Sequence, residues 1–316
     1  MAIVKPEQLD FSGKKFSMLI YGLPGVGKTT LALSAPKPLL LDFDRGISRV
    51  KANHRTASVQ SATYEEVLND LRSPEAKEFE TIVVDTGGSF ITFLQDWAIR
   101  TNPAQNQQKN GAISLKGFGA VKQEFIRFTN FVKDTLNKNL IYVFHSDEQK
   151  DKDGNPMQRI VAEGAAKNLV WMPCDFGGYI QMIGNERTIS FTPSQEYSAK
   201  GSYGIEGTYN IPHITNDDKN DFLTNLFELA KKNIAEETKA KTPQKEQYNA
   251  IMAEVGAIVA AITNAEEATQ AAKYIPSLEH VLTSKKESSA LLNAKCKELG
   301  LKWSKAEGKY LPVMPK

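Results

Sequence analysis

The segment Gly22-Leu23-Pro24-Gly25-Val26-Gly27-Lys28-Thr29 matches the pattern G-x-x-x-x-G-K-[ST] at every position. Its glycines allow successive backbone N–H groups to curl around phosphate oxygens, and it joins an apolar stretch to a helical one, as this mechanism requires. We expect the Lys28 ammonium to contact the β- and γ-phosphates and the Thr29 hydroxyl to bind Mg²⁺. The segment therefore predicts a nucleotide-binding loop, with contacts from Gly22, Pro24, Gly25, Val26, Gly27, Lys28, Thr29 and Thr30.

Acidic side chains end two of the apolar stretches that follow this loop. Asp85 comes directly after Ile82-Val83-Val84, and we expect its carboxylate to orient the magnesium ion. Asp42 and Asp44 end an earlier stretch, and alternate residues of an extended chain point to the same side. Either of these two carboxylates could polarise an attacking water, or the pair could cap a turn before Gly46.

Apolar stretches of strand length alternate with helical patterns through the first 235 residues. Near-continuous apolar strands are typical of a parallel sheet with helices on both faces, and such sheets bind ligands at the carboxyl ends of their strands. After Cys174 the pattern changes to successive antiparallel strands and a closing helix. We therefore predict an α/β fold with a mostly parallel central sheet flanked by helices, with strands at residues 16–22, 38–44, 79–86 and 139–146.

The 316 residues include 39 Lys and Arg against 37 Asp and Glu, a formal net charge of +2. That balance excludes a protein whose whole surface binds nucleic acid, although it allows a local basic groove. The composition changes near residue 236, after which the chain contains neither Asp nor Arg. We predict a nucleotide-binding domain at 1–235, a polar linker at 236–247 and a helical accessory region at 248–316 that ends in two short strands around a turn.

The remaining composition indicates a reduced, intracellular protein. Cys174 and Cys296 are too far apart in sequence for a CxxC pair, and the four histidines show no metal-ligand spacing. No apolar run reaches the roughly 18 residues of a membrane span, and residues 1–13 lack the apolar segment of a signal peptide. We expect a cytoplasmic protein without a membrane partner.

The segments GLPGVGKTTLA, DFDRG, VVDTGG, FGAVKQEFIRF, VFHSDEQKD and EGAAKNLVWMPCDFGGYI together resemble the phage RecA-like P-loop ATPases of the Sak-type single-strand annealing and recombination group. The resemblance covers roughly residues 14–195. It implies a RecA-like core that hydrolyses ATP with Mg²⁺ and in which Asp44 activates water, although RecA-like proteins more often have Glu there. It also implies that His145, at the end of the fourth strand, senses the γ-phosphate in place of the Gln of RecA; from the residues alone, a lone histidine there is more often structural.

The resemblance further implies that two polar loops line a channel for single-stranded DNA. The loop at 101–119 carries Lys109 and Lys116 without an acidic residue, and glycines and prolines discourage a helix within it. The loop at 147–163 follows His145 and carries Lys150, Lys152 and Arg159. Long loops in a compact domain are usually functional or disordered, so both loops could also be solvated surface.

The resemblance implies an assembly and partners as well. It implies a homo-oligomer, either ring or filament, in which Arg159 or Lys167 reaches the γ-phosphate of a neighbouring subunit; a solvent-facing Lys167 is the simpler interpretation. The implied partners are single-stranded DNA and a single-strand-binding protein, the latter through the C-terminal region. A phage-encoded chain would work in the host cytoplasm, promoting annealing or strand pairing in homologous recombination.

Two other functions remain open at this point. The near-neutral charge also suits a nucleotide-switched protein-interaction module without DNA activity. A small-molecule kinase is a further alternative, although the sequence shows no Arg-rich lid: Arg159 is the one arginine of 157–163.

Overall fold

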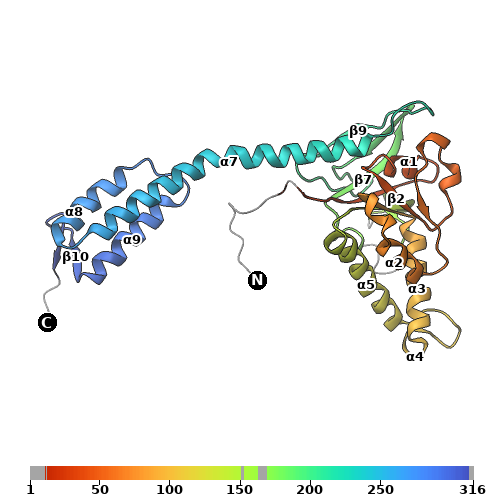
Figure 1. Ribbon diagram of the computed structural model, residues 1–316, viewed down its shortest axis with the longest axis horizontal. Coiled ribbons are helices and arrows are strands. Elements are labelled where there is room, and N and C mark those ends of the chain that lie inside the picture. Colours follow the sequence, from red (N-terminus) through yellow and green to blue (C-terminus); the bar gives the residue numbers. More distant parts are fainter. Residues whose placement is uncertain (1–10, 12, 151–152, 163–168, 313–316) are drawn as a thin grey trace. The chain divides into compact units, whose positions relative to one another are not determined.

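The computed structural model describes residues 11, 13–150, 153–162 and 169–312, except for the side chains of 238–242. The chain forms two compact units, which divide between Ile234 and Ala235 (Figure 1). In the described part of the chain, no helix is both long enough and apolar enough to cross a lipid bilayer.

The first unit is built on one sheet with the strand order β3-β2-β4-β5-β1-β7-β8-β9, in which β6 pairs with the outer part of β5. Neighbours from β3 to β7 are parallel, whereas β6, β8 and β9 pair antiparallel. This arrangement confirms the predicted mostly parallel sheet. The strands are β1 (Ser17–Gly22), β2 (Pro38–Asp42), β3 (Ser58–Val59), β4 (Thr81–Asp85), β5 (Asn139–Lys150), β6 (Pro156–Ile160), β7 (Phe176–Ile183), β8 (Glu186–Ser190) and β9 (Thr208–Asn210).

Strand β5 lies between β1 and β4, so the strand before the phosphate loop is not a direct neighbour of the strand that ends in Asp85. The register nevertheless brings the strand ends to one edge of the sheet, because Gly22 pairs with His145 and Asp42 with Asp85. Parallel strands present their carboxyl ends together, which is where this class of sheet binds ligands. The order and the register therefore place the predicted phosphate loop and the strand-end acids at one edge of a mostly parallel α/β sheet.

Helices flank both faces of this sheet. Thr63 and Glu66 form a capping box at the start of α2. The side chains of Thr86 and Ser114 each accept a hydrogen bond from a backbone N–H in the first turn of α3 and α5, respectively. The helices of the first unit are α1 (Lys28–Ala32), α2 (Tyr64–Arg72), α3 (Gly87–Thr101), α4 (Pro103–Asn106), α5 (Leu115–Asn130) with the π-helical turn η5 (Phe131–Thr135), the 3₁₀ turns η2 (Ile47–Arg49), η3 (Ala52–His54) and η4 (Glu75–Glu78), and the start of α7 (Phe222–Ala261).

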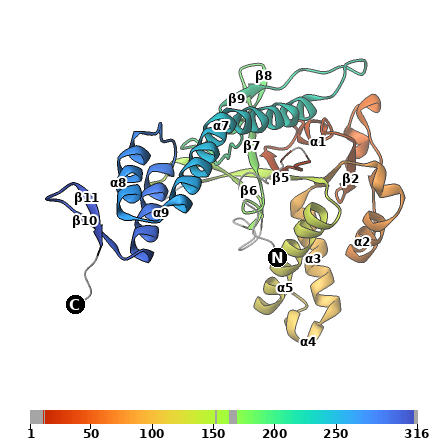
Figure 2. The same cartoon turned by 60° about the vertical axis from the view of Figure 1, so that its left-hand side comes forward.

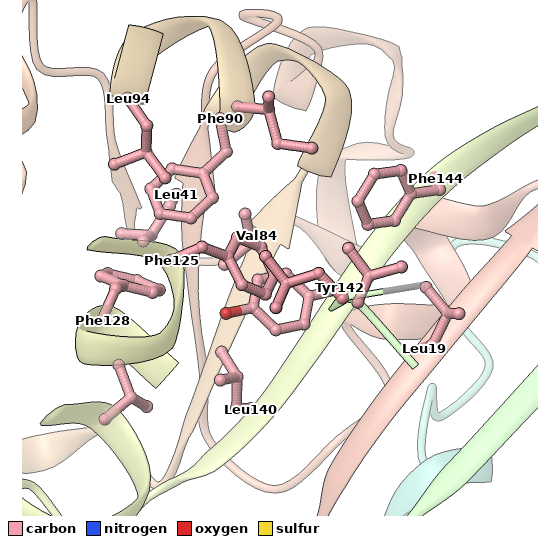
Figure 3. Packing of buried hydrophobic residues seen from close by; sticks show 14 of the residues in the cluster. Leu19, Leu41, Val84, Phe90, Leu94, Phe125, Phe128, Leu140, Tyr142 and Phe144 are labelled. Atoms are coloured by element: carbon pink, nitrogen blue, oxygen red, sulfur yellow. The ribbon is translucent and has the colours of Figure 1, made fainter. Parts of the chain in front are cut away.

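The core consists of one hydrophobic cluster on each face of the sheet. Successive side chains of a strand point to opposite faces, so Leu19 and Tyr21 of β1 enter one cluster while Ile20 enters the other. The first cluster includes residues of α2, α3 and α5. Figure 3 shows its α3 and α5 side chains packed on the strands, where the rings of Phe125 and Tyr142 stack with centroids 5.0 Å apart. The second cluster includes residues of α1 and α7. Burial on both faces explains why the central strands are apolar throughout.

The second unit contains the C-terminal part of α7, then α8 (Ala265–Tyr274), η6 (Ile275–Ser277), α9 (Ser284–Glu298) and an antiparallel hairpin of β10 (Leu301–Ser304) and β11 (Lys309–Pro312), all visible in Figure 2. Its core includes Val255, Leu292 and Tyr310, and the Tyr310 ring meets the Trp303 ring edge to face at 5.1 Å. The strands expected at the end of the chain are these two strands of the hairpin.

The segment 236–247, which the sequence predicts to be a linker, lies inside α7 and is helical. Its Lys, Glu, Gln and Ala residues favour a helix, and this preference outweighs the proline that suggested a break. Pro243 stands within the helix, where a proline removes one backbone hydrogen bond. The predicted linker is therefore a helical connection.

Candidate nucleotide-binding site

The phosphate loop runs from the end of β1 into α1, and its backbone explains the glycines at Gly22 and Gly27. Gly27 is the N-cap of α1 with φ of +82°, a left-handed conformation that glycine adopts without steric cost. At Gly22, a β-carbon would lie 2.5 Å from the carbonyl oxygen of Ile180 on the neighbouring strand β7. The loop residues Pro24, Gly25 and Val26 lie between these two points, and Lys28, Thr29 and Thr30 form the first turn of α1.

Lys28 is 5% exposed, and its ammonium lies over the loop. Its Nζ donates hydrogen bonds to the carbonyl oxygens of Gly22 at 3.0 Å and Leu23 at 2.8 Å. Burial lowers the pKa of Lys28 to about 8, while the Asp85 carboxylate acts in the opposite direction. A buried cation held by neutral carbonyls fits a site that an anionic phosphate completes.

Thr29 and Asp85 meet where the two motifs converge. The Thr29 hydroxyl donates a hydrogen bond of 2.5 Å to Oδ2 of Asp85, which is 8% exposed at the end of β4. Burial is the main cause that raises the pKa of Asp85 to about 6, and the carboxylates of Asp44 and Asp42 raise it further, whereas Thr29 and Lys28 lower it. A second positive charge at this point would favour the ionised carboxylate.

The hydroxyl and the carboxylate are oxygen ligands of the kind that Mg²⁺ prefers. Within the described residues, no group of three or more His, Cys, Asp or Glu side chains could hold a metal ion by itself. Mg²⁺ usually keeps several waters and binds through one or two carboxylates together with substrate phosphates. Thr29 and Asp85 therefore fit a magnesium ion that arrives with a nucleotide.

The structure distinguishes Asp42 from Asp44, which the sequence leaves equivalent. Asp42 is buried, and its carboxylate accepts hydrogen bonds from the Gly46 N–H at 2.6 Å, the Ile47 N–H at 3.1 Å and the Gln60 amide at 3.0 Å. These hydrogen bonds use the Asp42 carboxylate to stabilise the turn after β2. Asp44 lies within that turn and accepts a hydrogen bond from the Ser89 hydroxyl in the first turn of α3.

His145 lies on β5 directly beside Gly22 of the phosphate loop. Its Nδ1 is buried, and no hydrogen-bond partner for it is found in the part of the chain that the structure describes. Burial and the Lys28 ammonium lower the pKa of His145, so the imidazole is neutral near pH 7; the Asp44 carboxylate opposes this shift and Arg49 adds to it. A buried nitrogen without a partner is costly, which fits an imidazole that completes its hydrogen bonds with a ligand.

The segment 101–119 is ordered and differs from the expected open loop. Asn102 caps the short helix α4, a bridge pairs Gln107 with Ile113, and α5 begins at Leu115. These elements form the far tip of the antiparallel pair α3 and α5 (Figure 1). Lys109 lies in the turn at this tip, and Lys116 lies in the first turn of α5. Asn102-Pro103 and Ser114 are helix-start signals that the sequence analysis did not use.

The segment 147–163 is likewise a hairpin over most of its length. Strand β5 continues past His145 to Lys150 and pairs with β6, so that Asp147 lies opposite Arg159. The Asp153-Gly154 pair, with Gly154 at φ of +86°, is a hairpin-turn signal from which this hairpin could have been predicted. Lys150 and Arg159 are exposed on this hairpin, and Figure 2 shows its strand β6 apart from the α4 tip. Lys152 and Lys167 lie outside the described residues.

Arg187 is a cation of the site that sequence reasoning did not identify. It lies on β8, and a β-carbon at Gly27 would collide with its guanidinium. Gly27 and Arg187 are far apart in the chain, and no local motif marks the arginine. The order of β1, β7 and β8 in the sheet brings the two residues together.

Comparisons with known proteins identify the family. No curated protein matches this chain by sequence. A solved KaiC-like protein from Pyrococcus horikoshii OT3 is 12% identical with a TM-score of 0.36, over 62% of this chain and 89% of that one. The flagellar accessory protein FlaH from Methanocaldococcus jannaschii is 9% identical with a TM-score of 0.31, over 55% of this chain and 75% of that one.

Residues 14–203 match a family model described as an AAA domain. Because that match spans more than half of the chain, the protein belongs to the AAA domain family and is a P-loop ATPase.

Proposed function

We propose that this protein hydrolyses ATP with Mg²⁺ and that its nucleotide state controls binding of single-stranded DNA, in support of homologous recombination. The observation that carries the proposal is the continuity of strand β5. One strand contains His145, beside the phosphate loop, and Lys150, on the exposed hairpin. Five residues of an extended strand separate the two by about 17 Å. A change at His145 therefore reaches the hairpin through a single rigid element.

Each residue of the site has a role in this proposal. Lys28 binds the β- and γ-phosphates, and Thr29 with Asp85 holds the metal. Mg²⁺ supplies neutralisation of the charge that develops on the phosphate oxygens. Asp44 orients the attacking water and accepts its proton, because Asp42 is already engaged in the turn after β2. His145 donates a hydrogen bond to a γ-phosphate oxygen through Nδ1, the nitrogen that has no partner among the described residues.

The proposed assembly is a homo-oligomer, ring or filament, on single-stranded DNA. Lys150 and Arg159 are exposed cations in the described part of the hairpin and would contact DNA phosphates or, for Arg159, a neighbouring subunit's nucleotide. Lys109 and Lys116 would form a second contact at the α4 tip. A single-strand-binding protein would dock on the second unit.

The test is the affinity of a fluorescent single-stranded oligonucleotide with ADP and with a non-hydrolysable ATP analogue, across a series of salt concentrations. The two nucleotide states should differ at least about fivefold in affinity, a typical coupling between sites. Replacing Lys150 and Arg159 together by Ala should reduce the slope of log K against log salt by about 1.4, since each single-strand phosphate contact contributes about 0.7. Lys122→Ala, an exposed lysine of α5, should leave the slope unchanged. Equal affinity in both nucleotide states would disprove the coupling.

A second function is favoured by the acidic residues of the same hairpin. Asp147, Glu148 and Asp153 accompany Lys150 and Arg159, so the described part of the hairpin is not basic overall. A mixed surface of this kind suits a protein partner better than a phosphate backbone. In that case the protein is a nucleotide-switched docking module, and oligonucleotide binding is weak and equal in both nucleotide states. Nucleotide-dependent co-sedimentation with a single-strand-binding protein in the absence of DNA would then be the expected positive result.

A further inference from the structure

Arg187 approaches the phosphate loop from the β8 side of strand β1. The residues assigned to the metal and the attacking water lie on the other side of β1, toward β5 and β4. The Arg187 side chain extends from β8 to Gly27, where Nη1 occupies the space that a β-carbon would need. Its Nη2 donates a hydrogen bond of 2.9 Å to the carbonyl oxygen of Pro212, and its own backbone oxygen accepts one from Ile211 at 2.7 Å. The guanidinium is therefore held against the loop by contacts with the segment that follows β9.

The charge of this guanidinium is not balanced by an ion pair within the described part of the chain. Among the residues that the structure describes, no carboxylate forms an ion pair with Arg187. The nearby ammonium of Lys219, in contrast, pairs with Asp221 at 2.8 Å. Burial alone lowers the pKa of Arg187, and an arginine keeps its charge in proteins even so. A half-buried guanidinium beside a phosphate loop is stabilised when an anion supplies the missing countercharge.

The sheet order indicates which part of a nucleotide Arg187 faces. The metal residues Thr29 and Asp85, with Asp44 and His145, lie toward β4 and β5, on one side of β1. Arg187 comes from the other side, through β7 and β8, and lines a small cavity together with Thr30. The γ-phosphate must lie on the metal side, so the phosphates nearer the nucleoside lie toward Arg187.

We propose that Arg187 is a nucleotide-binding residue that contacts the α- and β-phosphates in its own subunit. The inference rests on the proposed binding of ATP at the phosphate loop and adds a second cation to Lys28. ADP and ATP share these phosphates, so Arg187 contributes equally to the binding of both and not to the transition state alone. A trans-acting arginine that stabilises the γ-phosphate would behave differently, because its removal lowers the turnover number.

The test is Arg187→Gln, which removes the charge while leaving an amide N–H to donate to Pro212. A charge-assisted contact of this kind predicts Kd increases of about 10-fold or more for ADP and for a non-hydrolysable ATP analogue, equal for the two within about twofold. Turnover at saturating ATP should stay within about twofold, so the loss appears in KM. Inorganic pyrophosphate should displace a fluorescent ADP from the wild type but require a correspondingly higher concentration with the variant. Arg127→Gln, an exposed arginine of α5, is the matched control and should change none of these values.

The outcomes separate this inference from the function on which it rests. If the wild type binds nucleotide and Arg187→Gln binds ADP equally well, Arg187 is not a ligand, while the ATPase proposal stands. If turnover falls with unchanged ADP affinity, the arginine acts at the γ-phosphate and the inference is wrong. If Arg187→Lys, which keeps the positive charge, restores pyrophosphate competition in part, the charge is responsible. If it restores none while the fold is intact, the charge is not responsible and the inference is overturned. Wild-type protein that binds no nucleotide would refute both proposals.

Discussion

The Thr29 hydroxyl donates a hydrogen bond of 2.5 Å to the Asp85 carboxylate, and this bond joins the first turn of α1 to the end of β4. The two residues are 56 positions apart in the sequence, and strand β5 lies between β4 and the strand that leads into α1. The hydroxyl and the carboxylate are in contact, and the buried Lys28 belongs to the same loop. Together they are the protein ligands that a magnesium nucleotide needs, because Mg²⁺ takes its other ligands from phosphates and water. The contact therefore connects the two sequence motifs as one site.

The raised pKa of Asp85 predicts a pH-dependent cost to stability in the absence of nucleotide and metal. The folded protein holds the Asp85 proton up to about pH 6, whereas the unfolded chain releases it near the ordinary value of 3.8. The folded state binds more protons in that range, so stability falls as pH rises from about 4 to about 6 and is constant above. Two pKa units correspond to ~3 kcal/mol. Asp85→Asn, which keeps an acceptor for Thr29, should raise the thermal midpoint at pH 7.5.

Thermal unfolding of both proteins at pH 4 and pH 7.5, in buffer with a chelator, measures this effect. The advantage of the variant should shrink toward zero at the lower pH, because the wild-type carboxyl is largely protonated in the folded state there and costs little. Identical pH dependence of the two proteins would show that Asp85 does not titrate differently in the fold. Magnesium nucleotide should reverse the order at pH 7.5, since the amide of the Asp85→Asn variant lacks the charge that binds the metal.

Asp44→Asn and Asp42→Asn should have opposite consequences for turnover and stability. Asp44→Asn should slow ATP turnover by about 100-fold or more, the typical contribution of a general base, and leave the thermal midpoint nearly unchanged. Asp42→Asn places an amide where Gly46, Ile47 and Gln60 all donate, so it should cost about 1–3 kcal/mol of stability. Steady-state kinetics and urea unfolding of both variants provide the comparison. A large loss of turnover confined to Asp42→Asn would exchange the two roles.

His145 should act as a neutral hydrogen-bonding group and not as a titrating one. Its pKa is lowered chiefly by burial, so the imidazole is neutral near pH 7 and above. His145→Gln, which is neutral and has both a donor and an acceptor, should keep the ATP-dependent change in oligonucleotide affinity. His145→Ala should lose that change while its ATP affinity stays within about threefold. Equal behaviour of the two variants would mean that the Nδ1 atom has no role in the coupling.

The features that could be predicted from the sequence are those with local causes. The glycines, Lys28 and Thr29 form a contiguous motif, and Asp85 ends an apolar strand; both patterns reflect backbone requirements within a few residues. The central strands are buried on both faces, so their near-continuous apolar runs indicate the parallel sheet directly.

The features that could not be predicted depend on contacts between distant segments. The alternation of side chains along a strand places Asp42 and Asp44 on the same side. Their different roles follow from the turn after β2, where Asp42 also accepts a hydrogen bond from Gln60. Arg187 reaches Gly27 through two intervening strand pairings, for which no spacing rule exists. The helical state of 236–247 was hidden by Pro243, since a proline inside a helix is rarer than one at its end.

The rate of phosphate release from ATP with Mg²⁺ by the wild type and by Lys28→Ala tests the central claim of the site most directly. Lys122→Ala is the control for loss of a lysine elsewhere in the same unit, and thermal unfolding verifies that each variant is folded. The wild type and the control should turn over ATP at the same rate, whereas Lys28→Ala should lose at least about 100-fold, because Lys28 provides the cation at the β- and γ-phosphates. Unaltered turnover by a folded Lys28→Ala variant would contradict the assignment of residues 22–29 as the catalytic phosphate loop.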